Sequence, residues 1–322
     1  MEKTLIIGSS GMVGVSLALK LREKYGGENV IASDIREENP TLKGTGPYVI
    51  LDALDKEAVG VLIDKEKITS VYLLAGLMSA GAEKNPNLAW DLNMGSLKNI
   101  LDLASDLMKE TGQKLKIFWP SSIAVFGPTT PRNNTPQKTI LEPSSIYGVT
   151  KYAGELLCQY YHNRYAVDVR SLRYPGLISW KSEPGPGTTE YAVEIFYGAI
   201  KDKKFTAPLK PDTYLPMMYM EDAINGTLQL MNTESGRIKN RMSYNFSAIS
   251  FSPKDIADEV KKHIPDFEIT YNPDYRQAVA DSWPQSIDDS VARADWGWKH
   301  EYDLQKMVEV MLKNLKEKLK SV

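Results

Sequence analysis

Tyr147 and Lys151 lie four residues apart in the stretch SIYGVTKYAGELLC, residues 145–158, which has the pattern of an amphipathic helix near its start. Side chains four apart on a helix project from one face, one turn from each other. A tyrosine hydroxyl titrates near about 10 in isolation, and a neighbouring ammonium lowers that pKa by favouring the phenolate. The pair could therefore serve as a general base and its activator, although the same spacing also occurs between ordinary surface residues.

A second group of hydroxyls ends a strand-like run, KIFWPSS at residues 116–122. In an open parallel sheet, ligands bind beyond the carboxyl ends of the strands. Ser121 and Ser122 therefore fall where chemistry is expected, and a hydroxyl there could hold a substrate oxygen while Tyr147 takes its proton. The alternative is a polar strand end without a chemical role.

Three glycines, Gly8, Gly11 and Gly14, directly follow the first strand-like run and open a helical segment. A dinucleotide-binding turn needs one glycine for the tight turn, one for close approach to the pyrophosphate and one for helix–strand packing. The helix N-terminus then offers free N–H groups and a partial positive charge to phosphates. The motif is weak by itself, and its spacing departs from the commonest fingerprint, in which the first two glycines are two apart.

Two aspartates end the next two strands. Asp34 closes VIASD about 20 residues after the glycines, where a carboxylate can accept hydrogen bonds from both ribose hydroxyls of NAD and repel the 2′-phosphate of NADP. Its alternative role is an N-cap or turn residue. Asp52 follows the third strand and could bind the adenine amino group or cap a helix.

The elements around these residues alternate in the first half of the chain, which predicts an α/β fold with a Rossmann-type doubly wound parallel sheet. We expect strands at 3–8, 29–34, 48–51, 70–75, 116–122 and 167–173, and helices at 12–25, 55–67, 87–110 and 147–165. Further helices are expected at 190–202, 221–233, 253–264 and 303–320. We therefore predict an NAD-binding domain over residues 1–175 and a smaller substrate-binding lobe over 176–322, with some segments rejoining the main sheet.

The bulk composition narrows the class of protein. With 42% hydrophobic residues, 25% charged residues and a net charge of −2, the chain fits a soluble globular protein without a nucleic-acid-binding surface. Its one cysteine, Cys158, suits a reducing compartment, and we expect a cytoplasmic location because no signal peptide or bilayer-spanning run is visible. The three histidines are scattered, so we expect no metal site.

In combination, these motifs resemble those of the extended short-chain dehydrogenase/reductases, which are NAD-dependent epimerase/dehydratase-like enzymes. The resemblance rests on the three glycines, Asp34, the serine in SSIAVFG, Tyr147-x-x-x-Lys151 and the segment YLPMMYMEDAINGTLQLM at 214–231. It implies that Ser122 is the catalytic serine and Tyr147 the general base. It also implies that Asn93 bends its helix and organises water near Lys151.

Lys151, in the same resemblance, holds the nicotinamide ribose and lowers the pKa of Tyr147 together with the positive nicotinamide ring. A base works best with a pKa near the working pH. Lowering a tyrosine pKa by about three units requires roughly 4 kcal/mol of preferential phenolate stabilisation. Two positive charges in a partly dry cleft can supply a stabilisation of that order.

Within this family, the chain is most similar to the NAD-dependent L-threonine 3-dehydrogenases, through PGPGTTEYAVEIF (184–196), LPMMYMEDA (215–223) and DSWPQSIDDSVARADWGW (281–298). The implied reaction converts L-threonine and NAD to L-2-amino-3-oxobutanoate and NADH. A nucleotide-sugar 4-epimerase is the alternative, whereas a dehydratase would carry an Asp-Glu pair where this chain has Ile123 and Ala124. A catalytically inactive NAD-sensing protein is a third possibility, but it would have no reason to keep Ser122, Tyr147 and Lys151 together.

The resemblance also implies a set of binding residues. For NAD these are Gly8, Ser10, Gly11, Met12, Val13, Gly14, Asp34, Ile35, Arg36, Asp52, Ala53, Leu54, Leu74, Ala75, Gly76, Tyr147, Lys151 and Tyr174. For L-threonine, whose ammonium, carboxylate and hydroxyl all need partners, we predict contacts with Ser79, Ser121, Ser122, Tyr147, Gly176, Thr188, Thr189 and Trp283. Of these, Ser79, Thr188 and Trp283 could instead be a turn serine, an N-cap and a core residue. A homodimer through helices 87–110 and 147–165 is expected on the same basis.

Overall fold

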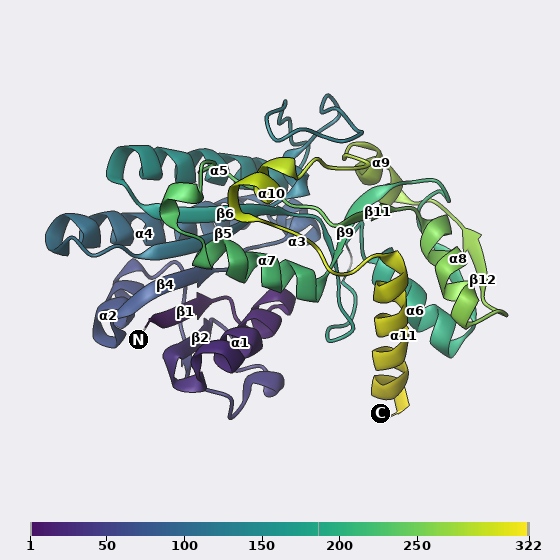
Figure 1. The fold of residues 1–322 in the computed structure, drawn as a ribbon, viewed down its shortest axis with the longest axis horizontal. Helices are drawn as coiled ribbons and strands as arrows, with labels where there is room; N and C mark the ends of the chain where they lie inside the picture. Colours follow the sequence, from purple (N-terminus) through teal and green to yellow (C-terminus); the bar gives the residue numbers. More distant parts are fainter. Residues whose placement is uncertain (1, 186, 321–322) are drawn as a thin grey trace. The chain divides into compact units, whose positions relative to one another are not determined.

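All six strands expected in the first half of the chain pair in one sheet of the computed structural model, which describes residues 2–185 and 187–320 (Figure 1). The strands of this sheet follow the order β10-β6-β5-β4-β1-β2-β3. The pairs from β3 through β2, β1 and β4 to β5 are parallel. With helices packed on the sheet, this is the predicted Rossmann-type α/β fold.

The strands have the following bounds: β1 Lys3–Ile7, β2 Val30–Asp34, β3 Tyr48–Ile50, β4 Ile68–Leu73, β5 Lys116–Ser122, β6 Asp168–Tyr174, β7 Gly176–Ile178, β8 Lys204–Ala207, β9 Leu215–Tyr219, β10 Tyr244–Asn245, β11 Ile249–Phe251 and β12 Glu268–Tyr271. The α-helices are α1 Met12–Tyr25, α2 Lys56–Glu66, α3 Ser79–Lys84, α4 Pro86–Thr111, α5 Ile146–Tyr165, α6 Tyr191–Lys201, α7 Met220–Asn232, α8 Pro253–His263, α9 Tyr275–Asp281, α10 Ser290–Trp296 and α11 Leu304–Lys320.

The chain divides into two compact units that are not continuous in sequence. The first comprises the residues up to Val125, Ser145–Arg173 and Thr227–Tyr244, and the second comprises Phe126–Ser144, Tyr174–Gly226 and the residues from Asn245 onward. The boundary after Arg173 lies close to the expected one at residue 175. The structure adds that 126–144 groups with the second unit and that 227–244 returns to the first, where β10 joins the edge of the main sheet.

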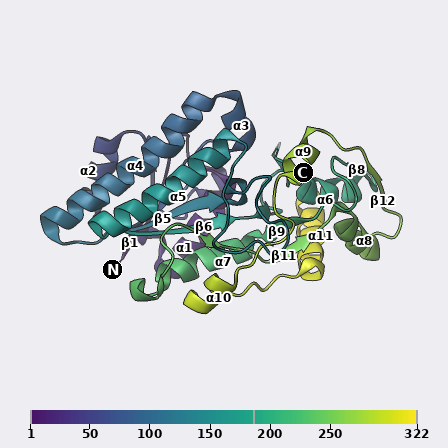
Figure 2. The same cartoon turned by 90° about the horizontal axis from the view of Figure 1, so that it is seen from above.

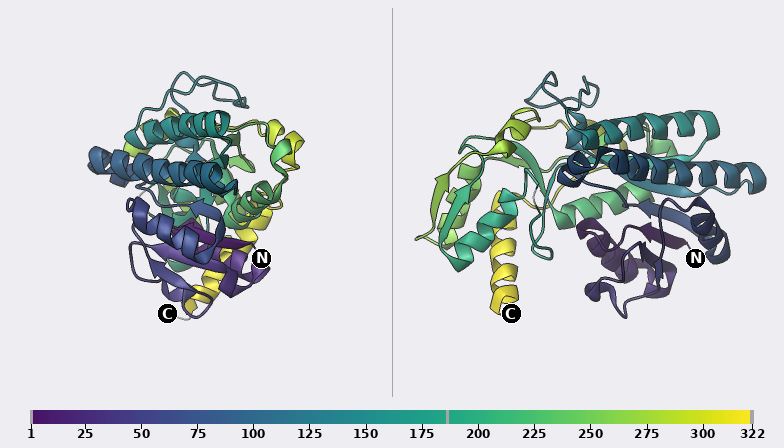
Figure 3. Two further views of the ribbon diagram at one scale, coloured as in Figure 1. Left: turned by 90° about the vertical axis from the view of Figure 1, so that its left-hand side faces the viewer. Right: turned by 180° about the vertical axis from the view of Figure 1, so that it is seen from behind.

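In the first unit, α4 and α5 run side by side along one face of the sheet and α1 covers the opposite face (Figures 2 and 3). Apolar residues of α2, α4 and α5 share one buried cluster with side chains from β1, β2, β4, β5 and β6. Since this cluster fixes both long helices against the strands, it also fixes the carboxyl ends of β4 and β5 relative to the first turns of α4 and α5.

The long helices begin at polar caps. The Asn85 side chain accepts a hydrogen bond from the Leu88 N–H at the start of α4, and Pro86 occupies the first turn, where its missing N–H costs nothing. The Ser145 side chain accepts from the Gly148 N–H, so α5 starts at Ile146, one residue before Tyr147. A cap at this point places Tyr147 and Lys151 in the first two turns of the helix.

The second unit contains a three-stranded sheet in the order β11-β9-β7 and a parallel pair of β12 and β8. Its buried cluster is formed largely by α6, α8 and α11 together with β9. Across the described residues, no helix is both long enough and apolar enough to cross a bilayer.

Candidate active site

The turn after β1 can be formed only by glycines at two of its positions. Gly8 has φ +93°, and a Cβ there would lie 2.5 Å from the Ala75 backbone nitrogen. At Gly14 a Cβ would lie 2.4 Å from the Gly8 carbonyl oxygen, so this residue lets α1 pack against the turn. Hydrogen bonds from the N–H groups of Gly8 and Ser9 to the Ser33 carbonyl, both 2.9 Å, hold the turn against the end of β2.

The start of α1 has the properties of a pyrophosphate site. Gly11 is the N-cap and supplies no side-chain cap, and the first turn carries no acidic residue. The first N–H group of α1 with an acceptor inside the helix is that of Val15, which donates to the Gly11 carbonyl. The N–H groups of Met12 and Val13 come before it and have no acceptor within the helix. Uncapped donors at the positive end of a helix fit the phosphates of a dinucleotide.

Asp34, at the end of β2, is 5% exposed and holds a carboxylate beside this helix start. Its Oδ2 accepts from the Ser10 N–H at 3.0 Å, and the Arg36 guanidinium donates to both of its oxygens, at 3.1 and 3.3 Å. Burial would raise the pKa of Asp34, but the hydrogen bonds from Arg36 and Ser10 outweigh it and lower that pKa. Asp34 is thus ionised, as a ribose-binding role requires. The adjacent Ile35, also a predicted NAD contact, is 66% exposed.

Asp52 is exposed, and its alternative role as a helix N-cap is wrong. The N-cap of α2 is Asp55, whose side chain accepts from the Ala58 N–H. The Asp52 carboxylate instead accepts from the Leu54 N–H at 2.9 Å and forms a turn before the helix. Ala53 is buried in this turn, while Leu54 is exposed, and their contact with adenine remains a prediction.

Asn93 ties two segments of the site together. Its side-chain oxygen accepts from the Leu77 N–H at 2.7 Å, and its amide group donates to the Leu77 carbonyl and, at 3.0 Å, to the Thr150 hydroxyl. Leu77 follows Leu74, Ala75 and Gly76 beyond the end of β4, and Thr150 is in the first turns of α5. The helix α4 continues through Asn93 without interruption, so the visible role of this residue is to fix the loop after β4 against α5.

Ser122, Tyr147 and Lys151 meet at the carboxyl end of β5. The Ser122 hydroxyl lies close enough to the Tyr147 side chain to act on it by hydrogen bonding and to lower its pKa. The Lys151 ammonium donates to the Pro120 carbonyl at 2.7 Å and lies 5.6 Å from the centre of the Tyr147 ring. The structure therefore brings together the serine, tyrosine and lysine that the sequence singled out.

The ionisation of this group differs from the expectation. Burial raises the pKa of Tyr147 to about 12, while the hydrogen bond with Ser122 acts in the lowering direction. Burial also lowers the pKa of Lys151 to about 8, against the influence of Cys158 and Glu155. The expected lowering of the tyrosine pKa by Lys151 is not provided by the protein alone, because removal from water penalises the phenolate and the ammonium together.

Glu155 is a buried acid of the site that sequence analysis missed. It is 0% exposed on α5, and its carboxylate accepts from the Ser121 hydroxyl at 2.7 Å and from Arg173 at 2.9 and 2.7 Å. Ser121, predicted to contact substrate, therefore already donates its hydroxyl to this carboxylate. The available signal was an acidic residue four after Lys151, on the helix face that carries the lysine.

The other predicted substrate residues divide between the units. Ser79 begins α3 in the first unit and is half-buried. Gly176, Thr188, Thr189 and Trp283 belong to the second unit, as does Tyr174, which was predicted to bind NAD. There a Cβ on Gly176 would lie 2.8 Å from the Thr189 side chain, and Trp283 packs at the edge of the buried cluster.

The turn that contains Thr188 and Thr189 precedes α6, whose N-cap is Glu190, so the alternative that Thr188 caps a helix is wrong. Ligand contacts of the residues in this turn remain predictions. Within residues 2–185 and 187–320, no three His, Cys, Asp or Glu side chains group in a way that could hold a metal ion.

Comparison with known proteins gives matches along most of the chain. Residues 4–245 match the NAD dependent epimerase/dehydratase family. The chain is 48% identical over 320 residues to an uncharacterized epimerase/dehydratase of Staphylococcus haemolyticus, with 99% of each sequence covered.

Two solved structures are also similar. The GalE-like L-threonine dehydrogenase from Cupriavidus necator, in its holo form, is 51% identical with a TM-score of 0.93, covering 97% of this chain and 99% of its own. The L-threonine dehydrogenase from Clostridium difficile is 46% identical with a TM-score of 0.95, covering 99% and 98%.

Proposed function

We propose that this chain, which belongs to the NAD dependent epimerase/dehydratase family, oxidises L-threonine at C3 to L-2-amino-3-oxobutanoate with NAD as hydride acceptor. The observation that carries the proposal is the meeting of Ser122, Tyr147 and Lys151 at one strand end, in a chain similar over its whole length to proteins named L-threonine dehydrogenases. The family supports oxidoreductase chemistry, and the similar proteins support the substrate.

The cofactor is NAD, as the family description states. The residues present fit it: the glycine turn, the uncapped start of α1 and the Asp34 carboxylate suit the pyrophosphate and the ribose. When bound, NAD accepts the hydride from C3 and brings a positive charge on its nicotinamide ring. We assign the loops that contain Asp52–Leu54 and Leu74–Gly76 to the remainder of the cofactor.

Tyr147 removes the proton from the C3 hydroxyl of threonine as the C3–H bond breaks. The Ser122 hydroxyl, which acts to lower the pKa of Tyr147, donates a hydrogen bond to the substrate oxygen and stabilises the phenolate. Because burial holds the pKa of Tyr147 at about 12, the base needs further positive charge before it works near neutral pH. The Lys151 ammonium, held by the Pro120 carbonyl, contributes part of that charge.

The polar ends of L-threonine require donors and acceptors in addition to these three residues. We assign Ser79 to its carboxylate or ammonium, and we keep Gly176, Thr188, Thr189 and Trp283 as predicted contacts. Ser121 is the predicted contact with the least support, because its hydroxyl donates to Glu155. A site that uses several hydrogen bonds rejects analogues that lack one of the polar groups.

A homodimer through α4 and α5 is the second part of the proposal. The two helices run together on one face of the first unit, and large apolar side chains remain exposed on both: Leu88, Trp90, Val149, Leu156 and Tyr160. On α5 the exposed residues Val149, Leu156 and Tyr160 share one face of the helix. Such a patch marks an interaction surface.

We also propose a cytoplasmic location, which rests on the single cysteine.

Deuterium transfer tests the reaction. L-Threonine deuterated at C3 is incubated with the enzyme and NAD, and the NADH is analysed by mass spectrometry. The proposal predicts one deuterium per NADH and slower turnover than with ordinary threonine. Absence of NADH with threonine, together with epimerisation of a nucleotide sugar, would support the alternative activity of the same fold.

A further inference from the structure

A buried charge cluster lies directly behind the proposed catalytic residues. Glu155 is 0% exposed and Arg173, on β6, is 2% exposed. The Arg173 guanidinium donates to both carboxylate oxygens of Glu155, at 2.9 and 2.7 Å. The third donor to this carboxylate is the Ser121 hydroxyl, at 2.7 Å. The carboxylate is thus held from two strands, β5 and β6.

The same cluster borders Lys151. Glu155 follows Lys151 by four residues on α5, so both side chains leave the same face of the helix. The Lys151 ammonium donates to the carbonyl of Pro120, the residue directly before Ser121. One residue of β5 therefore binds the lysine through its carbonyl, and the next binds the glutamate through its hydroxyl.

The charged and titratable groups around Lys151 come from two elements. On α5 they are Tyr147, Glu155 and Cys158, and on β6 the charged group is Arg173, which pairs with Glu155. From β5 the lysine meets the Trp119 ring, at 4.5 Å, and the Pro120 carbonyl. Burial raises the pKa of the Cys158 thiol well above its usual range, so Glu155 is the anionic group on this helix face.

We propose that Glu155 is a positioning residue whose carboxylate, oriented by Arg173 and Ser121, keeps the buried Lys151 ammonium charged so that it can hold the cofactor and support Tyr147. Burial drives Lys151 toward its neutral form, and the carboxylate opposes that tendency. The positive charge of Arg173 disfavours the charged form of Lys151, whereas the Glu155 carboxylate favours it. The protonation of Lys151 therefore depends on the net effect of Glu155 and Arg173. This inference rests on the proposed role of Lys151 in the reaction.

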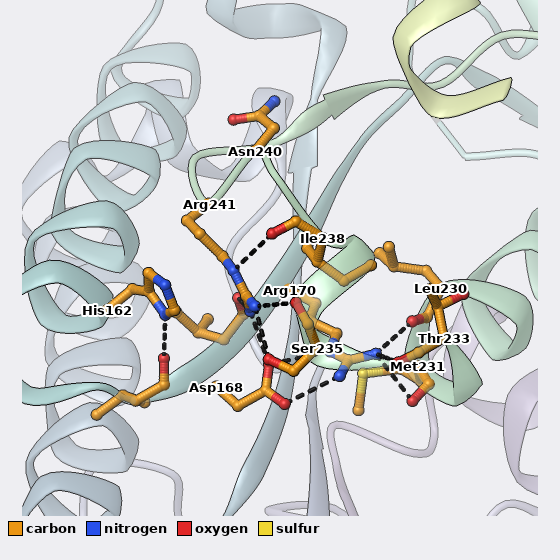
Figure 4. A network of polar contacts seen from close by, with 12 residues as sticks. His162, Asp168, Arg170, Leu230, Met231, Thr233, Ser235, Ile238, Asn240 and Arg241 are labelled. Atoms are coloured by element: carbon orange, nitrogen blue, oxygen red, sulfur yellow. Dashed lines mark hydrogen bonds and ion pairs between the residues drawn. The ribbon is translucent and has the colours of Figure 1, made fainter. Parts of the chain in front are cut away.

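The first unit offers a matched control for the purely structural contribution of such a pair. Asp168, at the start of β6, accepts from the Arg170 guanidinium through both oxygens, at 3.0 and 2.9 Å, and from Arg241 at 2.7 Å (Figure 4). This carboxylate is as well paired as Glu155. It lies about 16 Å farther back along the strand than Arg173, judged from the usual rise per residue.

The test measures the dissociation constant of NAD against pH, without substrate, for wild type, Glu155→Gln, Arg173→Gln and Asp168→Asn. Thermal unfolding of each variant checks that it is folded. Affinity is expected to fall as the pH rises through the pKa of Lys151. In Glu155→Gln the pH midpoint of that fall should move down by about one unit, and in Arg173→Gln it should move up. Asp168→Asn should leave the midpoint at its wild-type value even if its melting temperature drops.

The double variant Glu155→Gln/Arg173→Gln leaves no unpaired charge, and its midpoint should return toward the wild-type value. If one single variant does not fold, the midpoint of the other single variant carries the test, because the two are expected to move in opposite directions. Midpoints of the folded single variants equal to that of wild type, or an equal shift in Asp168→Asn, would overturn the proposal. Since the readout is NAD binding alone, an error in the assignment of threonine as substrate leaves the test intact. Conversely, normal threonine oxidation with unmoved midpoints would reject only the role of Glu155.

Discussion

At the scale of single residues, the proposed base lies in surroundings that favour its protonated form. Burial raises the pKa of Tyr147 to about 12, and Ser122 is the group that acts in the lowering direction. Tertiary packing determines how deeply a side chain is buried and how far it lies from other charges. A Tyr-x-x-x-Lys spacing therefore predicts which residues are catalytic but not the direction of their pKa shifts. Glu155 was missed for the same reason, because its pairing with Arg173 joins residues 18 apart in sequence.

Replacement of Tyr147 by phenylalanine should remove the base while preserving the packing of its ring. We expect kcat to fall by a factor on the order of 10² to 10⁴ with little change in NAD affinity. In the wild type, kcat/KM should rise with pH, because the phenolate is the active form and burial raises its pKa. Tyr152→Phe, on the same helix, is the control and should retain normal kinetics. Near-normal turnover of Tyr147→Phe would exclude this tyrosine from the mechanism.

Asp34 should set the preference for NAD over NADP. Its carboxylate is buried, and its pKa is lowered by Arg36 and Ser10 despite burial, so it presents a negative charge where a 2′-phosphate would lie. Asp34→Ala removes this charge and frees the Arg36 guanidinium, which pairs well with phosphate. The ratio of kcat/KM for NAD to that for NADP should fall by at least about tenfold. Comparable use of both cofactors by the wild type would contradict the assigned role.

At the scale of elements, the sequence predicted the long helices and the strands of the main sheet but missed the short helices. The strands at 3–8 and 29–34 and the helices at 87–110 and 147–165 are confirmed within two residues at either end. The helices α3, α9 and α10, of 6, 7 and 7 residues, were not predicted, because two turns give too few apolar repeats to distinguish a helix from a loop. Asp52 was considered as an alternative N-cap, but the N-cap of α2 is Asp55. Both aspartates lie in the short segment between β3 and α2, so their order alone does not distinguish them.

The Asp168 network should account for a measurable part of the stability of the first unit. Arg170 also donates to carbonyl groups at the end of α7, those of Leu230, Met231 and Thr233 (Figure 4). Removing the charge in Asp168→Asn should lower the free energy of unfolding by on the order of 3–5 kcal/mol, because two buried arginines lose their partner. Urea denaturation at neutral pH measures this loss, and a change of less than about 1 kcal/mol would contradict it.

The same carboxylate predicts the direction of the acid dependence. Burial would raise the pKa of Asp168, but Arg170 and Arg241 lower it from 3.8 to about 2. A depressed pKa contributes stability that is complete above 3.8 and is lost as the pH falls toward 2. This group should therefore contribute about 2 kcal/mol that disappears across that window in wild type and is absent from Asp168→Asn.

At the scale of the whole molecule, the expected partner is a second copy of the chain. The exposed residues Leu156 and Tyr160 lie on the free face of α5, and burying them requires another surface. The variant Leu156→Glu/Tyr160→Glu should therefore be a monomer by light scattering where the wild type is a dimer. Tyr275→Glu, at a tyrosine that is 69% exposed in the second unit, is the control and should not change the mass. A monomeric wild type would remove the dimer from the account.

A comparison of substrates with the wild-type enzyme tests the proposed reaction directly. Steady-state kcat/KM is measured with NAD and L-threonine, D-threonine, L-serine and 2-butanol, and with UDP-glucose assayed for its epimer. L-Threonine should be oxidised far better than its stereoisomer or 2-butanol. L-Serine should be poor, because it offers a primary alcohol and leaves the methyl position empty. Conversion of UDP-glucose to its epimer, with no oxidation of L-threonine, would show that the enzyme is an epimerase and not a threonine dehydrogenase.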